Sequence, residues 1–187
     1  MKNGLTTLIA IAALLSSPSV FAQGAGIEWD ILNDEVKELY RTGEYARAVV
    51  VGKKALKVAE ESVGPDHLDV ATSLNNLGLL YKTQGKYAAA EPLYKRALSI
   101  YEKALGPDHP SVARSLNNLA ALYDTQGQYA AAEPLYKRAL SINEKALGPD
   151  HPSVAASLNN LARFYRATGQ ILEAQELERR LLDKNQR

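Results

Sequence analysis

The sequence contains no cysteine among its 187 residues. This absence excludes disulfide bonds, thiolate metal sites and cysteine nucleophiles. Methionine and tryptophan occur once each and phenylalanine twice, so the ten tyrosines supply almost all of the aromatic content. An excess of positive charge is also missing, because 22 Lys and Arg residues face 21 Asp and Glu residues. A general nucleic-acid binder needs such an excess to neutralise phosphates, so we expect no nucleic-acid partner.

A long hydrophobic run is absent too, because the apolar segment at residues 5–15 is too short to span about 30 Å of hydrocarbon as a helix. Lys2 precedes this segment, a Ser-Ser-Pro sequence ends it, and Val20 and Ala22 place small residues where a signal peptidase reads them. These three zones predict a bacterial-type signal peptide over residues 1–22, cleaved after Ala22. The alternatives are an uncleaved anchor and a buried helix. We expect a periplasmic or secreted mature chain with no membrane insertion after cleavage.

The rest of the sequence is one unit repeated at a step of 42 residues. The string Gly-Pro-Asp-His begins at positions 64, 106 and 148, and Leu-Asn-Asn-Leu begins at positions 74, 116 and 158. Residues 86–127 and 128–169 are identical at 34 of 42 positions, and a fainter copy precedes them. Such a period indicates a repeat architecture. The predicted units of the repeat domain, which covers residues 23–187, are about 27–64, 65–106, 107–148 and 149–187.

The residue pattern of each unit predicts a pair of helices. The third unit illustrates the first helix of the pair. Apolar residues recur at spacings of three and four from Val112 to Tyr123. Pro110 suits the first turn of this helix, and Gly127 suits its end. We expect Asp108 to help cap the helix N-terminus.

The second helix of the third unit is expected over residues 128–147. Apolar side chains again recur at helical spacing there, and Gly148 with Pro149 ends the pattern. Pro134 lies several residues inside this range, where proline costs about 3 kcal/mol. The helix accommodates Pro134 by starting near Ala130 or by kinking.

These features together resemble the tetratricopeptide repeat, in the 42-residue form found in kinesin light chains and many bacterial proteins. The segments that carry the resemblance are Leu-Asn-Asn-Leu-Gly-Leu-Leu-Tyr at 74–81, Gly85-Lys86-Tyr87, Ala90, Tyr94, Ala97-Leu98 and the Gly-Pro-Asp-His loop. The resemblance covers about residues 27–182. It implies an all-α fold, a superhelical solenoid of about eight helices in four antiparallel pairs, and a protein or peptide partner.

The ends of the array depart from the repeat. Glu178 stands where the preceding unit has Tyr136, and Leu181 stands where it has Ala139. A terminal unit has a neighbour on one side only, so an altered outer face is expected there. Because Leu181 and Leu182 come almost last, we also expect some apolar surface to stay open at this end.

A metal or catalytic site is not predicted. The three histidines, His67, His109 and His151, occur once per unit, and equivalent positions in stacked helices lie about 8–10 Å apart or more. One ion bound at about 2 Å from each ligand cannot reach all three, so each is interpreted as a loop residue next to a helix start. Catalysis needs different groups converging on one point, whereas the polar residues here are copies spread along a rod. We therefore expect no enzyme and no cofactor.

A row of asparagines is the strongest candidate for a binding site. Asn76, Asn118 and Asn160 occupy the same position on the first helix of successive units, and Asn76 shares its face with Thr72 and Leu79. One interpretation is that the row bonds helix to helix. The other is that it lines a concave groove and grips a peptide backbone, because an amide offers both a donor and an acceptor. The resemblance implies the second, since the matching asparagine contacts bound peptide in kinesin-light-chain-like grooves.

Differences between the two closest units fall on the same face. Three of the eight differing positions, Arg114/Ala156, Ala121/Arg163 and Thr125/Ala167, share the face of Asn118, and Asp124/Arg166 borders it. Tuning of a binding surface explains this better than drift at exposed sites. Cations on that face point to an acidic partner segment. The predicted peptide-binding residues are Asn76, Asn118, Asn160, Thr72, Lys82, Arg114, Arg163 and Arg166.

The sequence therefore favours an exported, non-catalytic scaffold that binds an extended peptide or partner protein in its concave groove. The alternative is a self-assembling structural protein whose near-identical units stack end to end between chains. Homo-oligomerisation would follow from the alternative and not from the first hypothesis.

Overall fold

A computed structural model describes residues 18–185, and within them it contains eight α-helices and no strand. The helices are α2 (Pro18–Arg41), α3 (Tyr45–Val63), α4 (Leu68–Thr83), α5 (Tyr87–Leu105), α6 (Pro110–Thr125), α7 (Tyr129–Leu147), α8 (Pro152–Ala167) and α9 (Ile171–Asn185). The predicted all-α fold is confirmed. Most of the predicted signal peptide, residues 1–17, lies outside the described residues.

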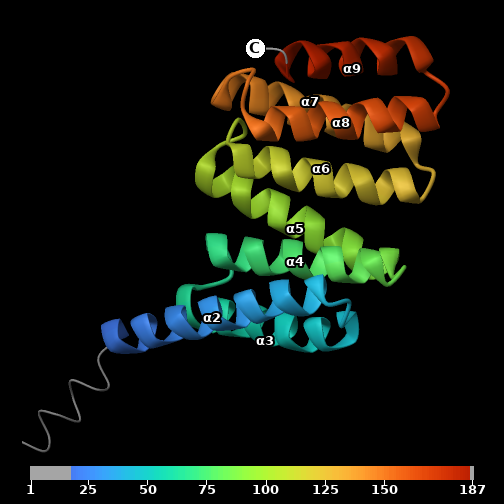
Figure 1. Ribbon diagram of the computed structural model, residues 1–187. Helices are drawn as coiled ribbons and strands as arrows, with labels where there is room; N and C mark the ends of the chain where they lie inside the picture. Colours follow the sequence, from blue (N-terminus) through green and yellow to red (C-terminus); the bar gives the residue numbers. More distant parts are fainter. Residues whose placement is uncertain (1–17, 186–187) are drawn as a thin grey trace, which may run out of the picture.

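The helices form a stack of pairs. Each helix packs against the helices before and after it, and the first helices of successive pairs, α2, α4, α6 and α8, also touch one another. Figure 1 shows this stack running from α2 and α3 at one end to α9 at the other. The predicted solenoid of helix pairs is therefore confirmed, and its consequence is a continuous surface formed by the first helices.

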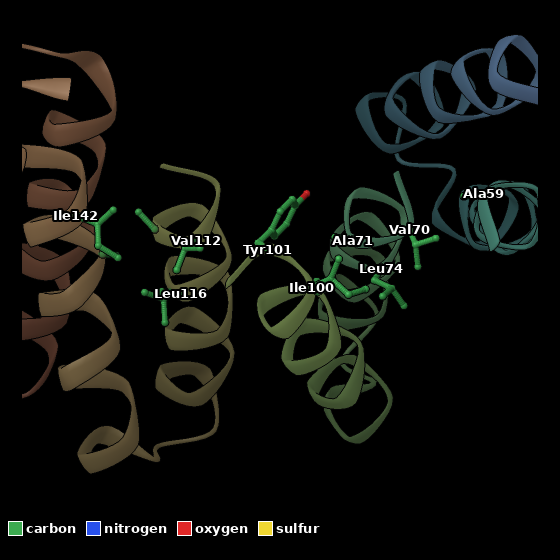
Figure 2. Close-up of a cluster of buried hydrophobic side chains, with 12 residues drawn as sticks. Ala59, Val70, Ala71, Leu74, Ile100, Tyr101, Val112, Leu116 and Ile142 are labelled. Carbon is green, nitrogen blue, oxygen red and sulfur yellow. The ribbon is translucent and has the colours of Figure 1, made fainter. Parts of the chain in front are cut away.

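Apolar side chains at helical spacing form buried clusters that join neighbouring pairs. A single cluster of buried residues extends from Ala59 of α3, through Val70 of α4 and Val112 of α6, to Ile142 of α7. Figure 2 shows these side chains meeting between successive helices. Because one unit buries little surface alone, the stack is stabilised mainly by contacts between neighbouring units.

The three histidines cap helices. In each loop the imidazole Nδ1 accepts a hydrogen bond from the backbone N–H two residues later, at 3.2 Å for His67 and 3.1 Å for His109 and His151. The side chain thus satisfies one of the free N–H groups that every helix N-terminus presents. The expectation that Asp108 caps α6 is corrected, because the capping side chain is His109.

Helices α5 and α7 run through their internal prolines. They begin at Tyr87 and Tyr129, the latter between the predicted start at residue 128 and the alternative start near Ala130, and continue past Pro92 and Pro134, which are exposed. The first helices end as expected, because Gly127 follows α6 with a φ of 72°, in the left-handed region that favours glycine.

Tyr94 of α5 fills a space that Gly78 of α4 leaves open. A Cβ atom at position 78 would lie 2.7 Å from Cε1 of the Tyr94 ring, closer than carbon atoms approach. The ring is fully buried, and its hydroxyl has no hydrogen-bond partner among the described residues. Burial raises the pKa of Tyr94.

We expect Tyr94→Phe to be neutral or stabilising at pH 7, because it removes a buried hydroxyl whose missing partner costs about 1–3 kcal/mol. Above pH 10 the unfolded phenol ionises while the buried one stays neutral, so this group lowers stability as pH rises. Urea unfolding at pH 7 and pH 11 should therefore show a smaller alkaline loss for Tyr94→Phe than for the parent. Tyr129→Phe is the matched control, since Tyr129 is 45 % exposed, and an equal change in both variants would contradict the assignment.

Candidate peptide-binding groove

Two clefts lie along the surface formed by the first helices. One, of about 440 Å³, lies between α2, α4 and α6, and the other, of about 360 Å³, lies between α6, α7 and α8. Arg114 and Asn118 of α6 line both clefts, so the two adjoin at α6 and are together called here the groove. The first cleft is lined by Asn33, Lys37, Thr72, Asn75, Asn76, Leu79, Arg114 and Asn118.

The predicted asparagine row lies in the groove. Asn76 lines the first cleft, Asn160 lines the second, and Asn118 lines both. The Asn76 amide donates to Oδ1 of Asn33 at 2.6 Å. By contrast, the side-chain amides of Asn118 and Asn160 form no hydrogen bond with another described residue. Two half-buried amides therefore keep their donors and acceptors available to a ligand.

The helix-to-helix interpretation applies to Asn76, through Asn33 of α2, and to the preceding asparagine of the first two Leu-Asn-Asn-Leu strings. Ser115 of α6 donates to Oδ1 of Asn75 in α4 at 3.3 Å, and Asn117 of α6 donates to Oγ of Ser157 in α8 at 3.2 Å. The serine repeats every 42 residues, like its asparagine partner. Sequence reasoning missed this structural row, although the paired periodicity of serine and asparagine could have indicated it.

Three predicted cations lack a carboxylate partner. Lys82, Arg114 and Arg163 form no ion pair with a described Asp or Glu side chain within 4.0 Å. Arg114 instead donates to the Tyr101 hydroxyl at 3.3 Å. Burial lowers the pKa of Lys82, the charge of Arg163 lowers it further, and Asp124 opposes both. Of these three cations, Arg114 lines both clefts, whereas Lys82 and Arg163 line neither.

Arg166 and Thr72 are engaged within the protein. Arg166 of α8 donates two hydrogen bonds, each 2.5 Å long, to the carboxylate of Glu178 in α9, and this pairing lowers the pKa of Glu178. Glu178, which stands where the preceding unit has Tyr136, thus links α9 to α8. Thr72 lies 3.0 Å from the Tyr101 hydroxyl and donates to the backbone carbonyl of Leu68.

Two negative findings concern the described residues. No group of three or more His, Cys, Asp or Glu side chains among them is arranged to hold a metal ion. None of the helices that the structure describes combines the length and apolar character required to cross a membrane.

The sequence matches the tetratricopeptide repeat family over residues 39–103, 83–145 and 125–186. Among solved structures, it is similar to BtubC (BKLC) from P. vanneervenii, with 26 % identity and a TM-score of 0.75 over 84 % of this chain and 63 % of that chain. It is also similar to a putative kinesin light chain of Podosopora anserina with nearly identical TPR-like repeats, with 26 % identity and a TM-score of 0.68 over 90 % of this chain and 85 % of that one. The chain thus spans less than two thirds of BtubC. No curated protein matches it in sequence.

Proposed function

The chain belongs to the tetratricopeptide repeat family, and from this premise we propose that it is an exported, non-catalytic scaffold that binds an extended segment of a partner protein in the groove. The repeat fold suggests a protein–protein interaction scaffold. The observation that carries the finer proposal is the state of Asn118 and Asn160, which line adjoining clefts and whose amides bond to no described residue.

An unused amide suits a peptide backbone. Its carbonyl accepts from a backbone N–H and its NH₂ donates to a backbone C=O, so it holds an extended chain without selecting a side chain. Asn118 and Asn160 occupy equivalent positions on the first helices of successive units, α6 and α8. They therefore present the same donor and acceptor groups twice along the groove. An extended segment presents its own backbone groups at regular intervals and so matches this arrangement.

Charges outside the two clefts supply further selection. Lys82 and Arg163, which line neither cleft, would pair with carboxylates of an acidic partner segment. Arg166 is assigned a smaller part, because Glu178 already neutralises it. The repeated character of the polar residues also supports a non-catalytic role, since catalysis needs different groups that converge on one point.

The proposal is tested by Asn118→Ala combined with Asn160→Ala. The mature chain captures a partner from periplasmic extract, and the affinity of that partner is then measured for each variant. Each lost hydrogen bond should cost about 0.5–1.5 kcal/mol, so the double variant should bind about tenfold to a hundredfold more weakly. Affinity of the parent should also fall with added salt, because the exposed cations are screened.

The matched control is Asn159→Ala, an exposed asparagine on the same helix that does not line the groove. It should leave affinity unchanged. The melting temperature of the double variant should stay close to that of the parent, because Asn118 and Asn160 bond to no described residue. A large drop in melting temperature with intact affinity would show that the row serves packing and would overturn the groove assignment.

A further inference from the structure

The two intervals between successive first helices differ in the residue that the second helix places there. Between α4 and α6 that residue is Tyr101 of α5, which is only 2 % exposed. Its hydroxyl lies 3.0 Å from Thr72 Oγ1 on α4 and accepts from Arg114 on α6. Figure 2 shows the Tyr101 ring between the helices that carry Ala71 and Val112, with its hydroxyl pointing away from the apolar cluster. Tyr101 thus links Thr72 of α4 to Arg114 of α6, two residues that line the first cleft.

The next interval, between α6 and α8, carries smaller residues at the equivalent positions. Asn143 stands where Tyr101 stands one unit earlier, and Ala156 stands where Arg114 stands. The surrounding sequence is nearly identical, so both exchanges remove volume from an otherwise repeated scaffold. The cleft of about 360 Å³ lies at this place, with Asn143 and Ala156 in its wall.

Asn143 has a fixed orientation and one unused atom. Its Nδ2 donates to the backbone carbonyl of Ser153 at 3.3 Å and to Oγ of Ser157 at 2.9 Å. A carbonyl can only accept, so the NH₂ group must face Ser153 and Oδ1 must face elsewhere. Asn143 is 4 % exposed, and its Oδ1 has no hydrogen-bond partner among the described residues. The Oδ1 of the neighbouring Asn117, which donates to the same serine, is likewise unpartnered. A buried acceptor without a donor destabilises the folded protein, so a ligand group that donates a hydrogen bond to either Oδ1 would be favourable.

The remaining wall is polar and contains one charge. Its members are Pro110, Ser111, Arg114, Asn117, Asn118, Asn143, Ser153, Ala156 and Asn160. No carboxylate is among them, and Arg114 is the single charged side chain. The guanidinium supplies donors only, whereas Asn143 and Asn117 leave acceptors only. A ligand group that accepts on one side and donates on the other is complementary to these three side chains.

We propose that the cleft between α6 and α8 is a subsite for a primary carboxamide, the side chain of a glutamine or asparagine in the segment bound by the groove. The carboxamide C=O accepts from Arg114, and its NH₂ donates to Asn143 Oδ1 after a small adjustment of the cleft wall. This inference rests on the proposed function and adds the side chain that the groove selects at this position.

The same chemistry disfavours the two nearest alternatives. A carboxylate has the shape of a carboxamide but no donor, so its oxygens would face the unpartnered oxygens of Asn143 and Asn117. The attraction of Arg114 does not offset this, because Arg114 is exposed and its charge is screened by solvent. An aliphatic side chain would fill the space but leave the buried acceptors without a partner.

The test uses the mature chain and four capped tripeptides, Ala-Gln-Ala, Ala-Glu-Ala, Ala-Leu-Ala and Ala-Tyr-Ala. Each is titrated while the side-chain amide signals of Asn118, Asn143 and Asn160 are followed by NMR. We expect the Gln peptide to shift these signals saturably and to bind about tenfold more tightly than the Glu and Leu peptides. Equal shifts by all four peptides, tighter binding of the Glu peptide, or no saturable shift would overturn the proposal, the last because the buried Oδ1 of Asn143 then meets no ligand donor.

Two variants copy the preceding unit into this one. Asn143→Tyr fills the cleft as Tyr101 fills the earlier interval, and Ala156→Arg narrows it from an exposed position that the core does not use. Each should abolish binding of the Gln peptide, while Asn159→Ala should leave it unchanged. If Ala156→Arg folds normally and binds the Gln peptide like the parent, the subsite is wrong. The proposed function is judged separately, because it requires partner binding to depend on Asn118 and Asn160 whatever the tripeptides do.

Discussion

Replacing Leu116 with alanine is expected to lower the free energy of unfolding by about 2–5 kcal/mol. Leu116 is fully buried in α6 and belongs to the cluster that extends from α3 to α7. Truncation removes apolar contacts and leaves a cavity in the middle of the stack (Figure 2). Because each unit is held mainly by its neighbours, a cavity there weakens the coupling between the two halves of the solenoid.

The measurement is urea unfolding followed by far-ultraviolet circular dichroism. The matched control is Leu172→Ala, the same chemical change at a leucine that is 79 % exposed on α9, where an effect within about 0.5 kcal/mol is expected. We also expect the transition of Leu116→Ala to broaden, since the two ends of the array then unfold with less mutual dependence. Similar losses in both leucine variants would contradict a core that is continuous through α6.

The repeat made the fold predictable from sequence. Apolar spacing defined each helix, and glycine at positions such as 127 and 148 marked where helices end, because these turns need a left-handed backbone. Identity between units then required equivalent packing in each. The open apolar surface expected at the C-terminal end is present in part, since Leu182 is 62 % exposed while Leu181 packs against the core.

The helix caps were less predictable. Aspartate is among the strongest capping residues, so Asp108 was the natural choice. The structure selects His109 because its backbone is extended and places the imidazole over the N–H of Ser111. Capping depends on backbone angles at single loop residues, and periodicity carries no information on these.

The sequence predicted which helix face carries the candidate site, but not which residues of the protein the side chains on it contact. Adjacent residues on a helix point about 100° apart, so Asn75 and Asn76 serve different surfaces although the sequence presents them as a pair. Residue spacing placed Asn118 on the same face as the variable positions. It did not indicate that Arg166 of α8 forms an ion pair with Glu178 of α9. The exchange of Tyr101 for Asn143 was visible as one of eight differences, but its effect on a cleft depends on packing between helices that are not neighbours in sequence.

Placing an arginine in the N-terminal apolar segment is expected to abolish export, the largest effect that any single substitution here should have. We propose that residues 1–22 direct the chain across the inner membrane, on the evidence of the sequence alone. Ile11→Arg interrupts the apolar run near its centre, where a charged side chain costs about 2.5–3.5 kcal/mol in apolar surroundings. Because the apolar segment is short, it does not tolerate a charged residue and still act as an export signal. The precursor should therefore accumulate in the cytoplasm with Met1 intact.

The matched control is Asn3→Arg, which adds the same side chain beside Lys2, where a signal peptide favours positive charge. It should leave export unchanged. A reporter fused to residues 1–23 separates export from folding of the repeat domain, and N-terminal sequencing of the exported parent should begin at Gln23. Export of the Ile11→Arg reporter at the parent level, or a parent protein that keeps Met1, would show that the segment is not a cleaved signal. The groove would then face cytoplasmic partners, and the search for its ligand would move to that compartment.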